Sequence, residues 1–185
     1  MMEAPVKNYC NFVATLPKDN VHRKYHDYEY GFPILSDEAL FERLILEINQ
    51  AGLSWDTILK KKENFFKAYD QFNIKKVANY KEPKIAQLLN DAGIIRNRLK
   101  IHAAIFNANA ILKLQKESGS FKSWIEQNHP LEKKEWVKLF KVHFKFTGGE
   151  IVNEFLMSSG YLAGAHSITC PVYKKILKTK PAWLS

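Results

Sequence analysis

Residues 46–65, with the sequence LEINQAGLSWDTILKKKENF, place a carboxylate and a tryptophan where they could do chemistry. Glu47 lies at the flank of an apolar helix face, and Trp55 follows Ala-Gly-Leu-Ser, which is typical of a helix stop and restart. Helical periodicity alone favours a half-exposed glutamate at a helix edge. In the alternative, Glu47 and Trp55 form the floor of a pocket.

A second set of residues has the chemistry of a metal site. Cys10, His26, His166 and Cys170 offer two thiolates and two imidazoles, the donor set of a closed tetrahedral zinc site. The spacing differs from that of a zinc finger, and such a site would join the two ends of the chain. A chance combination of unrelated histidines and cysteines is the competing interpretation. In a reducing compartment, free thiols or metal ligands are expected rather than a disulfide.

Composition narrows the class of protein. The chain has 185 residues, of which 46% are hydrophobic and 13% aromatic, which excludes a disordered protein. It has neither a run of 18 apolar residues nor a signal-peptide pattern, so we expect a cytoplasmic protein with no membrane association. The net charge of +9 favours a polyanion such as nucleic acid, although a basic surface can be incidental.

Hydrophobic periodicity predicts an all-α fold, with one domain over residues 1–185 that has two helical lobes and packed terminal segments. Ser36 and Ser54 are suited to cap two helices, and Gly52 separates them. Residues 1–36 and 163–185 are expected to be irregular, with one turn at 172–177. The predicted helices cover residues 36–50, 55–69, 74–79, 83–90, 97–117, 120–127, 132–141 and 150–159.

Residues 88–108, LLNDAGIIRNRLKIHAAIFNA, predict two helices joined by a tight turn at residues 92–94. Gly93 allows the backbone to turn and leaves it uncovered, and the following helix presents N–H groups at its N-terminus. Arg96, Arg98 and Lys100 surround that end. This pattern indicates a phosphate site that does not read sequence. An ordinary helical hairpin with a solvated basic face is the alternative.

Four stretches together resemble the DNA-3-methyladenine glycosylase I family of helix-hairpin-helix DNA glycosylases. They are NDAGIIRNRLKI in the hairpin, YHDYEYGFP at residues 25–33, LEINQAGLSWDTILKKKENF, and FKFTG with HSITC near the C-terminus. They follow the family's order from about Cys10 to Cys170. The resemblance implies a helix-hairpin-helix glycosylase fold, a helical bundle whose N- and C-terminal segments are tied by a zinc site.

The resemblance also implies a base pocket, in which a nucleotide flipped out of the duplex is held between aromatic rings. Glu47 occupies the family's base-recognition position and is the candidate catalytic residue, and Trp55 occupies the position of its stacking tryptophan. Tyr25 matches an aromatic pocket residue, Tyr30 replaces the usual tryptophan, and Phe12 is a further aromatic candidate.

Roles for the turn, the hairpin and the metal set follow from the same resemblance. Leu53, after Gly52, is a candidate wedge for the gap left by the flipped base, or else a plain apolar contact. Members carry a structural zinc on a Cys, a His and a C-terminal His-x3-Cys. The interval from Cys10 to His26 is longer than in the family, so the nearby His22 is the alternative to Cys10 as the fourth ligand. The DNA-backbone residues would be Gly93, Ile94, Arg96, Arg98 and Lys100, and the zinc ligands Cys10, His26, His166 and Cys170.

The resemblance implies a monofunctional glycosylase. The stretch after Ile101 lacks the Asp that most helix-hairpin-helix glycosylases place there, and the resembling family also lacks it. N3-alkylation makes adenine a cationic leaving group, so selective binding and desolvation can suffice, with Glu47 acting in recognition and electrostatics. We therefore expect a monomeric enzyme that excises N3-methyladenine from damaged double-stranded DNA in base excision repair, without lyase activity or a small-molecule cofactor.

Departures from the family leave the substrate range open. Glu150 and Glu154 stand where members carry small or hydroxyl residues, and Tyr30 shrinks one pocket wall. One alternative function is a non-catalytic, lesion-sensing DNA-binding protein with the same fold. The other is a helical protein–protein adaptor with an incidental basic surface.

Overall fold

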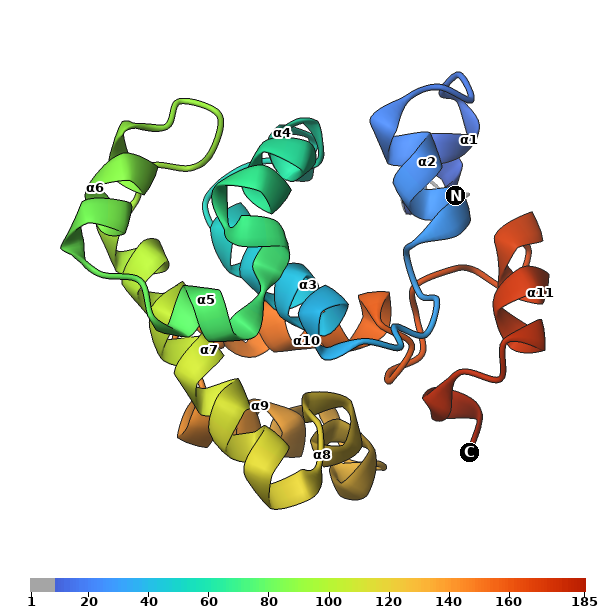
Figure 1. Ribbon diagram of the computed structural model, residues 1–185. Helices are drawn as coiled ribbons and strands as arrows, with labels where there is room; N and C mark the ends of the chain where they lie inside the picture. Colours follow the sequence, from blue (N-terminus) through green and yellow to red (C-terminus); the bar gives the residue numbers. More distant parts are fainter. Residues whose placement is uncertain (1–8) are drawn as a thin grey trace.

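The computed structural model describes residues 9–185, and all regular secondary structure in that part is helical (Figure 1), which confirms the predicted fold class. Within it, no helix combines the length and the apolar character that crossing a membrane requires. The helices are α1 Tyr9–Ala14, α2 Val21–Tyr28, α3 Asp37–Gln50, α4 Trp55–Ala68, α5 Ile74–Ala78, α6 Glu82–Asn90, α7 Arg98–Ser118, α8 Phe121–Asn128, α9 Lys133–His143, α10 Gly149–Ser158 and α11 Pro171–Lys178, with 3-10 turns η1 Asp70–Phe72 and η2 Ala182–Leu184.

Two serines begin the helices that carry Glu47 and Trp55. The Ser36 hydroxyl accepts the N–H of Ala39 at 3.2 Å, and the Ser54 hydroxyl accepts the N–H of Thr57 at 3.2 Å. Each bond satisfies a backbone donor that the first turn of a helix leaves unpaired. Between α3 and α4, Gly52 has a φ of +83°, a conformation that favours glycine. Both predicted caps and the predicted break are therefore confirmed.

Helix α3 lies in the middle of the bundle, where it contacts α4, α7, α8 and α10 (Figure 1). Its apolar face is fully buried at Leu40, Phe41, Leu44, Ile45 and Ile48. At its first turn, the Asp37 carboxylate accepts the backbone N–H groups of Phe121 and Lys122 at 2.7 and 2.9 Å. These bonds cap α8 and fix the start of the helix that positions Glu47.

The N-terminal segment contains α1 and α2, which the prediction of irregular structure missed, and the turn expected at residues 172–177 is the helix α11. The Asn20 side chain caps α2 by accepting the N–H of His22 at 2.9 Å, and Pro171 begins α11. These helices are too short for periodicity to reveal, and capping with tertiary packing stabilises them. Residues 1–8 of the predicted irregular arm lie outside the described residues. In Figure 1 the N-terminal helices and α11 lie on the same side of the bundle.

Candidate functional site

A cavity of about 400 Å³ brings together side chains from α1, α2, α3, α4 and α10. Four of the five predicted pocket residues meet in it, although they come from three different helices and the turn after α2. Its lining is mostly aromatic and carboxylic. The lining residues are Tyr9, Tyr25, Tyr30, Glu47, Gln50, Trp55, Glu150 and Glu154.

Three tyrosines and one tryptophan form the aromatic walls. The ring centroids of Tyr25 and Trp55 are 5.2 Å apart at 61°, and those of Tyr25 and Tyr30 are 5.5 Å apart at 36°. Tyr9 meets Tyr30 edge-on at 5.6 Å. These contacts fix the rings against one another, because aromatic pairs prefer offset and edge-to-face geometry. The walls can therefore receive a flat aromatic ligand with little rearrangement.

Phe12 does not line the cavity, and its predicted place there was wrong. Its side chain is 48% exposed, and its ring lies 5.4 Å from that of His22. Tyr9, three residues earlier on α1, lines the cavity instead. Sequence reasoning missed Tyr9, because which face of such a short helix turns inward depends on its packing against α2.

The Glu47 carboxyl is buried, with 4% of its surface exposed. Burial raises its pKa to about 8, while the positive charge of Arg43 lowers it and the negative charge of Glu154 raises it further. The edge-exposed glutamate that periodicity favoured is thereby ruled out. A cation bound in the cavity would stabilise the ionised form of the Glu47 carboxyl, because its charge would replace the hydration that burial removes.

Arg43 is a buried cation that sequence reasoning missed. It precedes Glu47 by one turn of α3, and it donates to the Tyr25 hydroxyl at 2.9 Å and the Ser158 carbonyl at 3.4 Å. It also pairs with Glu29 at 3.3 Å. The available signal was an arginine on an apolar helix face four residues before a glutamate. Arg43 thus holds Tyr25 in place and partly balances Glu47.

The two acidic residues of α10, Glu150 and Glu154, both line the cavity. The Tyr30 hydroxyl donates to Glu154 at 3.1 Å. Burial raises the pKa of Glu154, and the hydrogen bond from Tyr30 opposes this shift. The side chain of Glu150, by contrast, is 86% exposed and pairs with Lys133 at 3.3 Å.

The turn after α3 lies beside the cavity. Gln50, a lining residue, donates its side-chain amide to the Leu53 carbonyl at 3.2 Å. Leu53 is 40% exposed, and the space around Gly52 is open. An exposed apolar side chain on a tight turn at the edge of a cavity is suited to insertion between bases.

The loop between α6 and α7 covers residues 91–97, so it is longer than the tight turn predicted. Gly93 does not have a left-handed φ, and its N–H donates to the Asp91 carboxylate at 2.7 Å. A Cβ there would lie 3.2 Å from Asn64 of α4. Lys61 of α4 also donates to the Ala92 carbonyl at 2.7 Å. Glycine is therefore needed for close packing against α4 rather than for an uncovered turn.

The side chains of the predicted DNA-binding residues near the start of α7 divide into an exposed group and a buried group. Arg96 and Arg98 are exposed, and Arg98 pairs with Glu82 at 2.9 Å. Lys100 and Ile94 are buried, with 7% and 3% of their surfaces exposed. The side chains of these two residues therefore point into the fold rather than toward solvent.

The Lys100 ammonium has a structural role instead. It donates to the carbonyls of Asn49 and Ala51, at 2.9 and 2.8 Å, at the C-terminal end of α3. Burial lowers its pKa. A cation at this position satisfies terminal carbonyls and complements the helix dipole. Lys100 thus fixes the turn that carries Gly52 and Leu53.

Cys10, His26, His166 and Cys170 form a buried cluster whose ligand atoms lie within 4.8 Å of one another. The Cys170 sulfur is 3.7 Å from His26 Nε2 and 3.6 Å from His166 Nδ1, and the Cys10 sulfur is 3.7 Å from His166 Nδ1. Ligand atoms around a tetrahedral zinc, bonded at about 2.3 Å to sulfur and 2.0 Å to nitrogen, are separated by roughly this much. The cluster could therefore hold a metal ion.

The outer nitrogens of both imidazoles have oxygen partners. His26 Nδ1 lies 2.7 Å from the Asp27 carboxylate, and His166 Nε2 lies 2.8 Å from the Tyr30 carbonyl. Such partners orient ligating histidines. His22 lies outside the cluster, with its Nδ1 3.0 Å from the Tyr9 hydroxyl. Cys10, rather than His22, completes the four-residue set.

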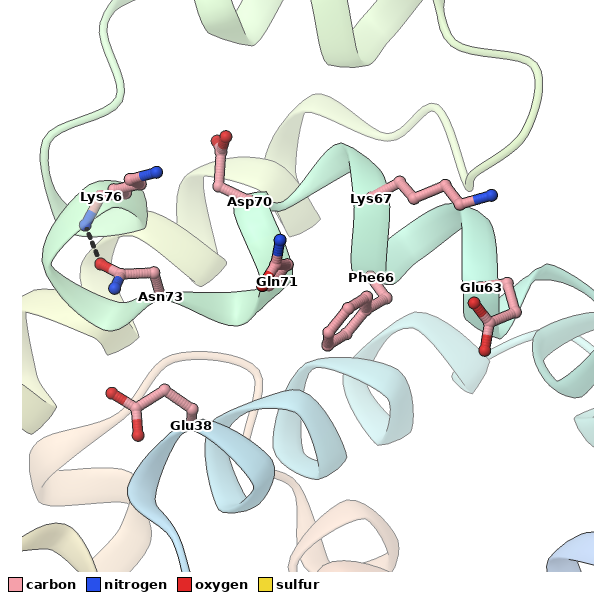
Figure 2. Close-up of a pocket in the computed structure, with 8 residues that line it drawn as sticks. All are labelled: Glu38, Glu63, Phe66, Lys67, Asp70, Gln71, Asn73 and Lys76. Carbon is pink, nitrogen blue, oxygen red and sulfur yellow. Dashed lines mark hydrogen bonds between the residues drawn. The ribbon is translucent and has the colours of Figure 1, made fainter.

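A larger cavity, of about 670 Å³, lies elsewhere, between the start of α3 and α4, η1 and α5 (Figure 2). Its lining side chains are exposed or half-buried and carry both signs of charge. Glu38 and Glu63 flank Phe66 there, with Lys67 and Lys76 nearby (Figure 2). The smaller cavity is the better site, because only it combines a buried carboxyl with several aromatic rings.

We predict that the free energy of unfolding falls with rising pH while the buried Glu47 stays protonated. The carboxyl has a pKa near 4.5 when unfolded and about 8 when folded, so the folded protein holds one more proton between these values. The loss should be about 1.4 kcal/mol per pH unit across this window, and it should end above the folded pKa. Urea unfolding of wild type and Glu47→Gln across the window measures it, because the variant lacks the contribution. The exposed Glu38→Gln should keep the wild-type slope, and a Glu47→Gln slope equal to wild type would contradict the assignment.

Comparisons with known proteins agree with this geometry. The model of the methyladenine glycosylase family matches residues 15–138. DNA-3-methyladenine glycosylase 1 of Escherichia coli (strain K12) is 35% identical over 183 residues, covering 89% of this chain and 96% of the relative. The DNA-3-methyladenine glycosylase of Haemophilus influenzae is 39% identical over 108 residues, 58% of each chain.

Solved structures show the same fold. The 3-methyladenine DNA glycosylase I of Staphylococcus aureus, solved to explain its recognition of 3-methyladenine, superposes with a TM-score of 0.78 at 32% identity, covering 89% of this chain and 97% of that one. A variant of 3-methyladenine DNA glycosylase I in complex with 3-methyladenine gives a TM-score of 0.76 at 32% identity, with the same coverage. This chain belongs to the methyladenine glycosylase family.

Proposed function

We propose that this protein is a monofunctional DNA glycosylase that excises N3-methyladenine from alkylated DNA. The observation that carries the proposal is the buried Glu47 carboxyl in a cavity walled by Tyr25, Tyr30 and Trp55. The relatives are named for this activity, and one structure similar to this chain contains the base itself. An aromatic cavity with a carboxyl suits a flat cationic purine and offers nothing specific to an uncharged one.

The reaction is hydrolysis of the bond between the base and C1′ of the sugar. A methyl group on N3 makes the attached adenine cationic, so the base can leave with the bonding electron pair as a neutral molecule. Water adds to C1′ and loses a proton to solvent. Glu47 and the aromatic rings select the cationic nucleotide and exclude water around it. Their negative electrostatic field also stabilises the positive charge that passes to the sugar as the bond breaks, so no strong general base is needed.

The position of Lys100 supports the absence of lyase activity. A lyase needs a free amine to attack C1′, whereas the ammonium of Lys100 is held by the carbonyls of Asn49 and Ala51. This is the lysine of the hairpin that follows the loop, and it is 7% exposed. The cavity lining itself contains no lysine.

For DNA engagement, we propose that the loop 91–97 and the start of α7 bind the phosphate backbone as a helix-hairpin-helix motif. Arg96 is exposed there, and Asn97 caps α7 by accepting the N–H of Lys100 at 3.1 Å. Leu53 would fill the space that the flipped nucleotide leaves, because its turn adjoins the cavity. Residues 1–185 would act as one domain and as a monomer on double-stranded DNA.

We further propose that the Cys10, His26, His166 and Cys170 cluster holds a structural zinc ion. Its donor set, burial and spacing fit zinc, and both cysteines are free thiols. A bound ion would cross-link the N-terminal helices to α11, which share a small apolar cluster. It would also hold Tyr30 in place, because His166 contacts the Tyr30 carbonyl.

The central test is release of free bases from methylated duplex DNA, separated by chromatography. Wild type should release N3-methyladenine. Glu47→Gln should reduce the rate roughly 10- to 100-fold, because an interaction with a charged partner is worth about 1.5–3 kcal/mol. Glu38→Gln, at the other end of α3, should act like wild type.

Other outcomes of this test have definite meanings. Normal release by Glu47→Gln would remove Glu47 from recognition. Salt-dependent binding to the duplex without any release would favour the lesion-sensing protein, and absence of DNA binding would favour an adaptor.

For the metal, we predict that the purified protein contains one zinc ion per chain. Cys170→Ser should lose it and lower the Tm by at least about 5 °C, because a metal that binds only the folded state contributes to stability. His22→Gln, a neighbouring histidine outside the cluster, should keep the ion. Elemental analysis and thermal unfolding with and without a chelator measure both effects. A metal-free protein whose Tm does not respond to added zinc would contradict the proposal.

For the hairpin, Arg96→Ala should weaken binding to damaged and undamaged duplexes equally. It should lower the slope of log affinity against log salt by about one, since one phosphate contact is lost. Lys116→Ala, an exposed lysine near the far end of α7, should leave the slope unchanged. A selective loss for damaged duplex would place Arg96 in the base pocket instead of on the backbone.

A further inference from the structure

The cavity contains a second internal carboxylate, Glu154, contributed by α10 rather than α3. It is half-buried, and the Tyr30 hydroxyl donates to it at 3.1 Å. Tyr30 is fixed in turn by its ring contacts with Tyr9 and Tyr25 and by the contact of its carbonyl with His166. Glu154 is therefore oriented toward the cavity by a rigid neighbour, unlike a mobile surface glutamate.

The charges around the cavity are unbalanced. Its lining includes three carboxyl groups, of which those of Glu150 and Glu154 are less buried than that of Glu47, whereas no lysine or arginine is among the residues that line it. Arg43 lies behind Tyr25 and pairs with Glu29, and it also faces Glu47. Lys133 pairs with the exposed Glu150. Glu154 accepts a hydrogen bond from the Tyr30 hydroxyl, and within residues 9–185 it forms no ion pair with a lysine or arginine.

We propose that Glu154, oriented by the Tyr30 hydroxyl, contacts the flipped base and makes the cavity select purines that carry a positive charge over neutral purines. The ligand class is purines that alkylation at N3 has made cationic. This inference rests on the proposed glycosylase function and deepens it. Glu47 supplies one carboxyl from α3, and Glu154 supplies another from α10.

The physical reason is the distribution of charge in such a base. An alkylated purine spreads its positive charge over the ring, so carboxylates that approach from two helices both stabilise it. A neutral purine has no charge for the second carboxylate to stabilise, yet its binding must still displace the water that hydrates this carboxylate. Glu154 consequently increases the preference for cationic over neutral purines more than it increases the affinity for purines in general.

The test measures binding of two free bases to the full-length protein by calorimetry. One is 3,9-dimethyladeninium, a permanent cation, and the other is 3-methyladenine at a pH at which it is neutral. Glu154→Gln should weaken binding of the cation about tenfold and change binding of the neutral base less than about twofold, as expected for loss of one charge near the ligand. Tyr30→Phe, which keeps the ring and removes the hydroxyl, should weaken binding of the cation by a smaller factor.

The matched control is Glu150→Gln, which makes the same charge change one turn earlier on α10, where solvent screens the carboxylate. It should weaken binding of the cation less than about threefold. Equal losses for both bases in Glu154→Gln would show a merely structural role and overturn the proposal. An equal effect of Glu150→Gln would show a general surface field and would also overturn it.

Base release by the wild type keeps the two proposals separate. If the wild type releases no base from methylated DNA but prefers the cation through Glu154, the glycosylase function fails and the selectivity stands. If it releases N3-methyladenine and Glu154→Gln keeps the wild-type preference for the cation, the selectivity fails and the function stands. Thermal unfolding of each variant confirms that the fold is intact.

Discussion

The burial of the Glu47 carboxyl within an aromatic cavity is the constraint on which the rest of the structure depends. A carboxyl removed from water favours its neutral form, and here its pKa is raised to about 8. The cost is tolerated because α3 is packed on several sides and is capped at its start by Ser36. Lys100 holds its other end. The Glu47 carboxyl, whose burial lowers the stability of the fold, is also the group that a bound cationic base would stabilise.

The terminal segments complete the cavity rather than merely closing the bundle. Helices α1 and α2 supply Tyr9 and Tyr25, and the metal-type cluster attaches these helices to the segment before α11. His166 of the cluster contacts the carbonyl of Tyr30, whose hydroxyl reaches Glu154. Tyr30 thus connects the cluster to the cavity. Loosening the cluster would therefore disturb the wall of the cavity at Tyr30.

The hairpin and the cavity are also connected. Lys100 lies in the first turn of α7, next to the loop 91–97, and its ammonium contacts the carbonyls of Asn49 and Ala51, which precede Gly52 and Leu53. Lys61 of α4 reaches the Ala92 carbonyl from the other side. The proposed phosphate-binding loop, the proposed wedge and the carboxyl helix are therefore held in one relative position. A protein that must place a flipped base accurately needs this rigidity.

The sequence by itself determined the helical class, the caps at Ser36 and Ser54, the break at Gly52 and the ligand types of the metal-type cluster. These depend on local periodicity, backbone conformation and donor chemistry, which neighbouring residues reveal. Tertiary structure alone decided that Tyr9 and not Phe12 lines the cavity, that Arg43 lies behind Tyr25, and that Lys100 faces inward. It also decided that the short terminal helices form, because each of these outcomes depends on burial against segments distant in the chain.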